Sequence, residues 1–273
     1  MQNTILITGC GSGIGRMTAK YFQQKGWNVI ASVRSDAGQD KELNSLDRVL
    51  VVDLDVTNED MIKQAVAAGV ARFGKIDVLL NNAGYGVYGI LEATPEKTIR
   101  MQFDVNVIGT LLVIKHVLPH MRKAKRGTLI NIASMGGKIS FPMGSLYHGS
   151  KFAVEGLSES LFFELESIGV KVKLIEPGMI NTNFAATTAS LLNVDLTQTE
   201  YQPFVENCLV AMGKLGGQAS EPIMVAEKIF EAATDGKSQL RYIAGPDAEQ
   251  IIAIRKQMDD ESYLAAIKIM FGL

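Results

Sequence analysis

The feature that most constrains this 273-residue chain is an alternation of short apolar, β-branched runs with longer segments of helical periodicity. The runs are apolar on both faces, as in a sheet that is covered on both sides. Strands are expected at Thr4–Thr8, Asn28–Val33, Val49–Leu54, Ile76–Asn81, Thr128–Ala133, Lys171–Glu176 and Leu240–Ala244, and helices near 14–25, 58–72, 96–124, 147–168, 222–235 and 247–270. This order predicts an α/β fold: a single Rossmann-type, doubly wound parallel sheet of about seven strands with helices on both faces.

Glycine and proline mark several of the expected boundaries. Gly26 and Gly74 end the first two helices, and the third begins with Thr94 as its N-cap and Pro95 in its first turn. Residues 183–221 interrupt the alternation, with glycines, threonines and scattered apolar residues. Long connections inside a compact domain are more often functional than idle, so we expect a mobile flap on the substrate side of a site.

Composition and charge exclude several classes of protein. The 27 basic and 29 acidic side chains leave a net charge of −2, which lacks the basic excess that binding to a nucleic acid requires. Cys10 and Cys208 lie too far apart in sequence for a disulfide framework and make no metal ligand set. The sequence shows neither a signal peptide nor an uncharged stretch apolar enough to span a membrane, so we expect a cytoplasmic protein.

A glycine-rich segment, Thr8-Gly9-Cys10-Gly11-Ser12-Gly13-Ile14-Gly15, directly follows the first expected strand and opens a helix. A helix N-terminus offers free backbone N–H groups and the positive end of the helix dipole, and glycine lets a pyrophosphate approach closely. The segment follows the pattern T-G-x-x-x-G-x-G rather than the literal G-x-G-x-x-G. An ordinary glycine-rich turn would have the same composition, but the position after an N-terminal strand favours a dinucleotide site.

The residue that follows the second strand bears on the choice of nicotinamide cofactor. An NAD site places a carboxylate there, about 20 residues beyond the glycines, for the ribose 2′-hydroxyl. This chain has Arg34, whose guanidinium suits the 2′-phosphate of NADP. Two alternatives stay open: Arg34 is simply solvated, or a small loop shift brings Asp36 to the ribose. NADP is favoured, with NAD as the alternative.

Tyr147 and Lys151 stand at i and i+4, on one face of an expected helix. Lowering a tyrosine pKa from about 10 toward 7 takes roughly 4 kcal/mol, which an adjacent ammonium and an oxidised nicotinamide could together supply. By itself the pair is a weak signal, because many surface helices carry it by chance.

Other polar residues strengthen this signal because they fall where strands end. Asn81-Asn82-Ala83-Gly84 closes the fourth strand, Ser134 the fifth, and Pro177-Gly178 with Thr182 the sixth. Asn106 stands in an otherwise apolar helix, where an amide needs partners. In a doubly wound sheet these strand ends line one edge, at which ligands bind. Because site residues from 8 to 182 must share that edge, we expect residues 1–273 to form a single dinucleotide-binding catalytic domain.

Taken in order, these motifs resemble those of the short-chain dehydrogenase/reductase family. They are TGxxxGIG at Thr8–Gly15, NNAG at Asn81–Gly84, Asn106, Ser134, Tyr147-x-x-x-Lys151 and Pro177-Gly178, and the resemblance covers about residues 1–185. It implies that Tyr147 is the general acid/base and that Ser134 hydrogen-bonds the substrate oxygen. It also implies that Lys151 binds the nicotinamide ribose and lowers the pKa of Tyr147, and that Asn106 holds a water of the proton relay.

The same resemblance implies the cofactor contacts. Asp55 and Val56 look like the pair that meets the adenine, Thr182 like the residue that meets the carboxamide, and Arg34 like the arginine of NADP-dependent members. The implied cofactor-binding set is Thr8, Gly9, Gly11, Ser12, Gly13, Ile14, Gly15, Arg34, Asp55, Val56, Asn82, Ala83, Gly84, Tyr147, Lys151, Pro177, Gly178, Ile180 and Thr182, with no metal. Within the family the chain is most similar to the branch of hydroxysteroid and retinol dehydrogenases.

Three further features bear on partners. His116 and His120 share a helix face, but no glutamate stands between them, so a solvated or interface pair is favoured over a metal site. The helices around 105–118 and 152–165 are apolar on nearly all sides, which predicts a homodimer or homotetramer. Near the expected site lie the apolar residues Phe141, Met143, Met179, Phe184, Leu191 and Leu192, and if they line a pocket the substrate is hydrophobic.

The sequence therefore predicts an NADP(H)-dependent oxidoreductase that interconverts a hydrophobic ketone or aldehyde and its alcohol by hydride transfer. The alternative is a cofactor-binding regulator or scaffold of the same fold without turnover. The complete set of Asn106, Ser134, Tyr147 and Lys151 argues against that alternative, because a pure binder has no need of Tyr147 or Ser134.

Overall fold

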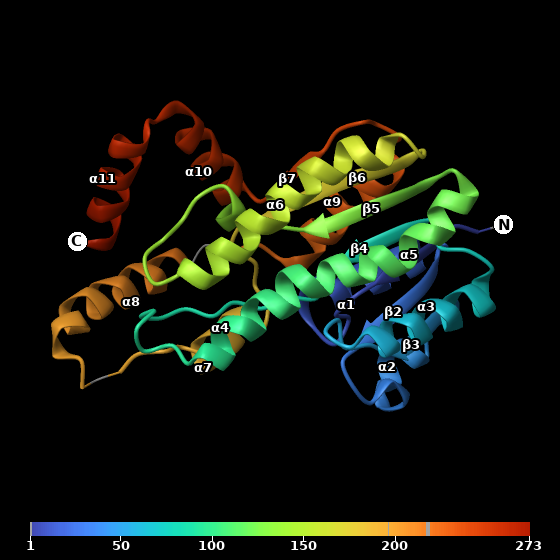
Figure 1. Cartoon of the computed structure of the whole chain (residues 1–273), viewed down its shortest axis with the longest axis horizontal. Helices are drawn as coiled ribbons and strands as arrows, with labels where there is room; N and C mark the ends of the chain where they lie inside the picture. The colour runs from blue at the N-terminus through green and yellow to red at the C-terminus, as the bar shows by residue number, and fades with distance from the viewer. Residues whose placement is uncertain (1, 196, 217–218) are drawn as a thin grey trace.

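The computed structural model describes residues 2–195, 197–216 and 219–273 (Figure 1). Its strands are β1 (Thr4–Ile7), β2 (Asn28–Val33), β3 (Val49–Asp53), β4 (Val78–Asn81), β5 (Gly127–Ile132), β6 (Val170–Pro177) and β7 (Arg241–Ala244). They form one seven-stranded sheet in the order β3-β2-β1-β4-β5-β6-β7, and every pairing is parallel. The predicted doubly wound parallel sheet is thereby confirmed.

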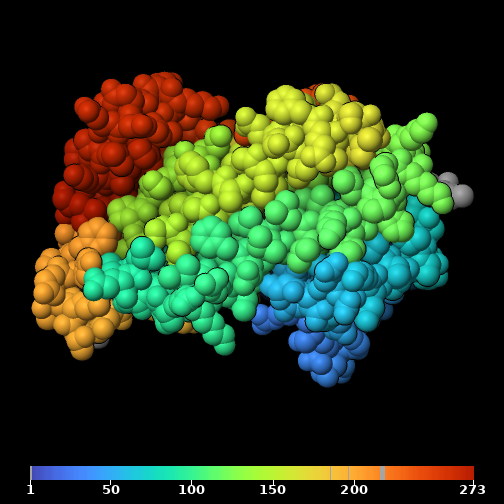
Figure 2. All heavy atoms as spheres, in the orientation of Figure 1, coloured from blue at the N-terminus to red at the C-terminus, as the bar shows by residue number. Residues whose placement is uncertain are grey.

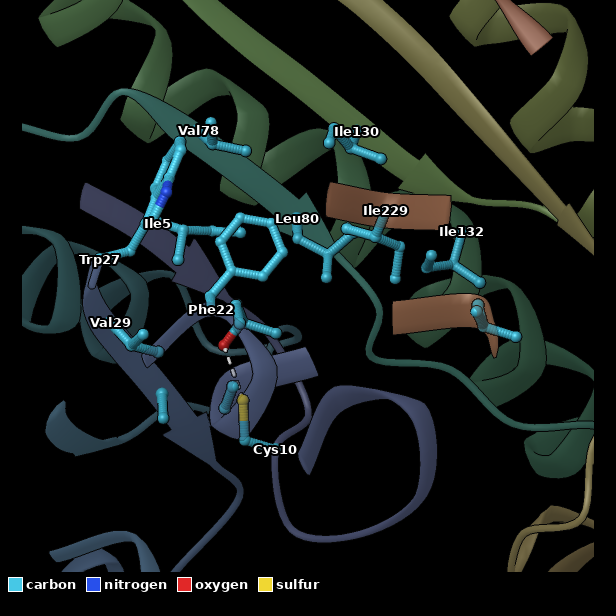
Figure 3. Packing of buried hydrophobic residues seen from close by; sticks show 14 of the residues in the cluster. Ile5, Cys10, Phe22, Trp27, Val29, Val78, Leu80, Ile130, Ile132 and Ile229 are labelled. Atoms are coloured by element: carbon cyan, nitrogen blue, oxygen red, sulfur yellow. Dashed lines mark hydrogen bonds between the residues drawn. The ribbon is translucent and has the colours of Figure 1, made fainter. Parts of the chain in front are cut away.

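Helices cover both faces of the sheet, which explains why the strands are apolar throughout. On one face, helices α1 (Gly13–Gln24) and α9 (Pro222–Thr234) pack over Ile5 and Ile7, and Figure 3 shows Phe22, Trp27 and Ile229 in this cluster. On the other face, α3 (Glu59–Phe73), α5 (Thr110–Ala124) and α6 (Ser145–Glu166) pack over Leu6 and Ile30. Successive strand residues point to opposite faces, so each strand fills two cores.

The long helical region predicted at 96–124 begins at Glu96, as expected, but it changes its pitch. It consists of α4 (Glu96–Phe103), a π-helical stretch at Asp104–Gly109, and α5. Pro95, rather than Thr94, is the N-cap, because its backbone is extended; the Thr94 hydroxyl instead donates to the carbonyl of Ile90. By length and composition the run from 96 to 124 could cross a membrane, but in this structure its residues Val113 and Val117 are fully buried in the core.

The structure also corrects the C-terminal elements. The helix predicted at 247–270 is two helices, α10 (Pro246–Gln257) and α11 (Asp260–Phe271). Met258 between them has extended backbone, and the Asp259 side chain accepts from Ser262 N to start α11. An aspartate at an N-cap is a signal for the start of a helix. The helical spacing of apolar residues across the region concealed this signal in the sequence.

The long connection at 183–221 contains two helices that sequence analysis missed, α7 (Phe184–Ser190) and α8 (Gln202–Gly216). Helix α8 buries Val205, Cys208 and Ala211 on one side. Leu209 and Val210 are apolar but exposed, so the helical spacing of apolar residues could not be recognised in the sequence. The mobility of this segment stays a prediction.

A third cluster, which we call the substrate-side cluster, lies beyond the carboxyl ends of the strands. Its buried members come from the segment after β4, the loop after β5, and α8, α10 and α11: Ile90, Met135, Ile139, Met143, Val205, Cys208, Ala211, Ala248, Ile252, Tyr263, Ile267 and Phe271. Helices α8 and α11 pack together, and Figure 2 shows them with α10 at one end of the molecule. The β5 arrow points toward this end, so strand-end residues face the cluster (Figure 1).

Candidate active site

The glycine-rich loop between β1 and α1 is shaped by close backbone packing. Gly9 and Gly13 have φ of +76° and +55°, in the left-handed region, and a Cβ on Gly15 would lie 2.3 Å from the carbonyl oxygen of Gly9. Ser12 is the N-cap of α1 without a side-chain capping bond, so the first N–H groups of the helix stay available. No atom lies within 4 Å of where a Cβ of Gly11 would stand. This open helix N-terminus fits the pyrophosphate of a dinucleotide.

Thr8, Asn82 and Ala83 join this loop to the end of β4. The Thr8 hydroxyl accepts from the backbone N–H groups of Asn82 and Ala83, both at 3.0 Å. The Asn82 amide donates in return to the carbonyls of Thr8 (2.9 Å) and Gly9 (3.1 Å). Each side chain thus hydrogen-bonds the other residue's loop. These bonds hold the shape of the glycine-rich loop and the end of β4, which together we call the dinucleotide edge.

Arg34 lies where the sequence placed the determinant of cofactor preference. It is exposed just beyond β2 and lines an open cavity of about 560 Å³ together with Asp55 and residues 57–61. The Asp55 carboxylate accepts from the N–H and the hydroxyl of Thr57, at 2.8 and 2.7 Å, while Val56 is buried. Asp36 is also exposed and has left-handed backbone (φ 60°). The structure thus brings Arg34 and Asp55 to one cavity.

Arg16 is a residue near this edge that sequence reasoning missed. Its guanidinium donates to the Gly11 carbonyl (3.2 Å) and pairs with the carboxylates of Asp40 and Glu42. A cation in the first turn of a helix opposes the dipole, and that mismatch was the available signal that Arg16 has acidic partners.

The catalytic candidates lie together at the carboxyl edge of the sheet. Ser134 follows β5, Tyr147 and Lys151 face it from α6, and each of the three is at most 8% exposed. The Ser134 hydroxyl accepts from Gly136 N (3.0 Å) and hydrogen-bonds the Tyr147 phenol. The Lys151 ammonium donates to the Ile132 carbonyl (2.8 Å) and lies 6.0 Å from the centre of the Tyr147 ring.

Burial decides the protonation of this pair. It raises the pKa of Tyr147 above its ordinary value of 10.0, and the hydrogen bond with Ser134 opposes the rise. Burial lowers the pKa of Lys151 from 10.5 to about 8, against the attraction of Glu155. The resemblance implied that Lys151 lowers the pKa of Tyr147, but the protein's own groups together raise it. At neutral pH the phenol therefore keeps its proton.

Asn106 occupies the π-helical stretch and is buried, and its side chain makes three hydrogen bonds. Its amide donates to the Tyr85 carbonyl (2.9 Å) and the Ser150 hydroxyl (3.0 Å), and its oxygen accepts from Tyr85 N (3.1 Å). The side chain therefore holds the Tyr85 loop against α6. Short π-helical stretches inside α-helices are frequent at functional sites. A water-binding role of Asn106 in a proton relay stays a prediction.

The segment after β6 contacts the first turn of α10. A Cβ on Gly178 would lie 2.1 Å from Asp247 Oδ1, and the other carboxylate oxygen accepts from Met179 N at 2.7 Å. Ile180 pairs with Ser220, and the Thr182 side chain lies 3.3 Å from where a Cβ of Gly13 would stand. The turn at Pro177-Gly178 thus carries Thr182 to the glycine-rich loop, as the dinucleotide site requires. Asp247, which anchors this turn, was not foreseen.

Several of the apolar residues predicted to shape the substrate side do gather there. Phe184 lies beside Tyr147, with ring centres 5.6 Å apart, and Tyr88 lies at the same distance from Tyr147. Phe141, Met143, Met179 and Leu192 belong to or pack on the substrate-side cluster, whereas Leu191 does not.

His116 and His120 form no metal centre among the described residues. His116 Nε2 lies 2.9 Å from a carboxylate oxygen of Glu59, and no group of three or more metal-binding side chains occurs in the part of the chain that the structure describes.

Comparison with known proteins decides the family. The profile of the short chain dehydrogenase family matches residues 3–193. The chain belongs to the short-chain dehydrogenase family. It is 42% identical over 270 residues to a 3-ketodihydrosphingosine reductase of Bacteroides thetaiotaomicron, with 98% of each chain covered.

Solved structures agree with this assignment. A short-chain dehydrogenase from Streptomyces avermitilis superposes with a TM-score of 0.80 at 30% identity, over 97% of both chains. The structure of ElxO with NADP bound superposes with a TM-score of 0.73 at 27% identity, over 89% of this chain and 98% of ElxO. This short-chain dehydrogenase is accordingly an oxidoreductase that uses a nicotinamide cofactor.

Proposed function

We propose that this short-chain dehydrogenase is an NADPH-dependent reductase of hydrophobic ketones, with Tyr147 as the proton donor. The observation that carries the proposal is the meeting of Ser134, Tyr147 and Lys151 at one buried edge, with the phenol held in its protonated form by burial. The apolar surroundings of Tyr147, with Tyr88 and Phe184 beside it, support a hydrophobic substrate.

The residues fit a bound nicotinamide cofactor in a definite way. The glycine-rich loop and the first N–H groups of α1 would hold the pyrophosphate, and Thr182 would meet the nicotinamide end. The cofactor when bound supplies the hydride. Ser134 would hold the carbonyl oxygen, Tyr147 would deliver a proton to it, and Lys151 would bind the ribose beside the phenol.

NADP is the proposed cofactor because Arg34 lines the open cavity next to Asp55. A guanidinium there favours a 2′-phosphate through charge-assisted hydrogen bonds. NAD would be favoured only if Asp36 turned toward the ribose, and its carboxylate stands on an exposed loop outside the residues that line the cavity.

The substrate class can be tested directly. The extensive similarity to a 3-ketodihydrosphingosine reductase makes that long-chain ketone the first compound to assay, beside short cyclic and aryl ketones. NADPH oxidation is followed by absorbance with wild-type protein and with Tyr147→Phe. Loss of the proton donor should lower kcat by about 10² to 10⁴-fold and leave the Kd for NADPH within about twofold. Full activity of Tyr147→Phe would refute the assignment of Tyr147.

We further propose that the protein is a homo-oligomer. Ile108 and Leu111 are exposed on one helical run, and Phe152 and Phe163 on α6, with Phe163 71% exposed. Exposed apolar side chains on two long helices are typical of a subunit interface. Sedimentation velocity of the wild type and of Phe163→Glu tests this: a monomeric wild type would contradict it.

A further inference from the structure

His148 directly follows Tyr147 on α6, and its hydrogen-bond partners favour one tautomer of the ring. Its ring is 4% exposed; Nε2 lies 3.0 Å from Phe141 N, and Nδ1 lies 2.9 Å from the Gly136 carbonyl oxygen. A backbone N–H can only donate, so Nε2 accepts and Nδ1 carries the proton. Burial lowers the pKa of His148 below its ordinary value of 6.5, against hydrogen bonds with the backbone of Gly136 and Ile139, which favours the neutral ring at neutral pH.

The two partners of this imidazole lie at opposite ends of the loop that follows β5. Gly136 belongs to the turn that Ser134 begins, whereas Phe141 lies near the start of α6. The loop has one strained residue, Met143, with φ of +63°. One ring therefore bridges the two ends of a loop that contains this strained residue.

The loop is shaped around the ring as well as bonded to it. A Cβ on Gly136 would lie 2.9 Å from His148 Nδ1, and one on Gly144 would lie 2.5 Å from His148 Cδ2. The Phe141 ring meets the imidazole edge-on, with ring centres 5.9 Å apart, and the Tyr88 ring does so with centres 6.2 Å apart. This is a fitted enclosure, and two glycines are needed to make room for it.

The constraint passes from His148 to the catalytic group through one residue. Gly136 accepts from His148 with its carbonyl and donates with its own N–H to the Ser134 hydroxyl, at 3.0 Å. That hydroxyl in turn hydrogen-bonds the Tyr147 phenol. His148 and Ser134 are thus linked through Gly136, which bonds His148 with its carbonyl and Ser134 with its N–H.

We propose that His148 is a positioning residue: its neutral Nδ1–H imidazole bridges Gly136 and Phe141 and thereby aims the Ser134 hydroxyl at the reacting oxygen. The inference rests on the proposed reductase function for its kinetic consequence. Its structural content, the tautomer and the clamped loop, does not depend on any substrate.

Two experiments separate these parts. Because the chain has only three histidines, long-range proton–nitrogen correlation spectra of labelled protein resolve each ring, and the signal lost in His148→Asn identifies His148. We expect the Nδ1–H tautomer at pH 7, and faster hydrogen exchange of the Phe141 amide in His148→Asn. An Nε2–H ring or an imidazolium at pH 7 would overturn the proposal, whether or not the protein turns over any ketone.

The kinetic experiment uses two amide variants. The short amide of His148→Asn can still donate to Gly136 but cannot reach Phe141, whereas His148→Gln can place an oxygen near the position of Nε2. His148→Asn should lower kcat/KM about tenfold, chiefly through kcat, with the Kd for NADPH within twofold; His148→Gln should recover part of the loss. The control, His120→Asn on the exposed side of α5, should leave both constants unchanged.

The outcomes of this experiment are distinguishable. If both His148 variants melt at a lower temperature but keep the wild-type kcat/KM, the residue is only structural and the proposal fails. If the wild type reduces no ketone in the panel, the proposed function fails, and the spectra and amide exchange still decide whether His148 clamps the loop.

Discussion

The dinucleotide edge and the substrate-side cluster are built in different ways. At the dinucleotide edge the shape comes from backbone: Thr8 and Asn82 bond to each other's main chains, and Gly15 lies too close to Gly9 for any side chain. In the substrate-side cluster the shape comes from side chains far apart in sequence, such as Phe141 and Phe271, whose ring centres are 5.5 Å apart. Backbone shape demands particular residues, whereas an apolar cluster accepts many sequences of the right volume.

This difference predicts that a substitution in one region changes the function of that region and leaves the function of the other unchanged. Phe271→Ala should have the largest effect, because Phe271 is 1% exposed and its loss leaves a cavity between α11 and the loop after β5. We expect the free energy of unfolding to fall by about 3 kcal/mol or more. At a temperature where the variant stays folded, kcat/KM should fall while the Kd for NADPH stays within about twofold.

A matched control stands on the same helix. Ile269→Ala removes a side chain that is 81% exposed and should change neither stability nor kinetics. Equal losses of NADPH binding and of substrate turnover in Phe271→Ala would show that the two regions are not separable.

The converse change is Thr8→Val at the dinucleotide edge. Valine keeps the shape but removes the acceptor of two backbone N–H groups, those of Asn82 and Ala83. A buried donor left unsatisfied costs about 1 to 3 kcal/mol. Isothermal titration should show NADPH binding weakened about tenfold, with Thr8→Ser close to wild type; an unchanged Kd in Thr8→Val would contradict the role of the hydroxyl.

Arg34→Ala tests the outer part of the same edge. Loss of a charge-assisted hydrogen bond of about 1.5 kcal/mol should weaken NADPH binding about tenfold and leave NADH binding nearly unchanged. Arg34→Lys should fall between the two, because it keeps the charge without the planar fork. Equal losses for both cofactors would refute the preference for NADP.

Two buried carboxylates, Glu155 and Glu176, should affect the pH dependence of stability rather than the binding of cofactor or substrate. Burial, and then the negative charge of Glu155, raise the pKa of Glu176 from 4.5 to about 7. The folded protein therefore binds more protons than the unfolded chain between these values, and this contribution to stability is lost as the pH rises from 4.5 through 7. Urea unfolding at pH 5 and pH 8 should show a decrease of roughly 1 to 3 kcal/mol that Glu176→Gln removes.

Glu159→Gln is the control for this change, because Glu159 pairs with the same Arg241 on the exposed surface. Hydrogen bonding to Arg241 lowers the pKa of Glu159, and burial affects it little. The Glu159→Gln variant should therefore lose as much stability between pH 5 and pH 8 as the wild type. A wild-type protein whose stability is the same at pH 5 and pH 8 would contradict the raised pKa of Glu176.

Much of the fold and the dinucleotide edge followed from sequence alone. The strands could be recognised because each is covered on both sides and hence apolar throughout, and Gly26 and Gly74 ended helices as expected, at φ of +85° and +81°. Helix α8 could not be recognised, because exposed Leu209 and Val210 blurred its period. His148 was overlooked because a lone histidine has no local pattern; its partners, Gly136 and Phe141, lie in a loop without regular periodicity.

By itself, then, the sequence determined the parallel sheet, its carboxyl edge, and the order of Ser134, Tyr147 and Lys151 along it, because strand ends in such a sheet must meet at one edge. Only the tertiary structure decided the protonation of Tyr147 and Lys151, the commitment of the Asn106 amide to Tyr85 and Ser150, and the enclosure of His148. Burial and hydrogen-bond partners set these properties, and both arise from segments brought together by folding.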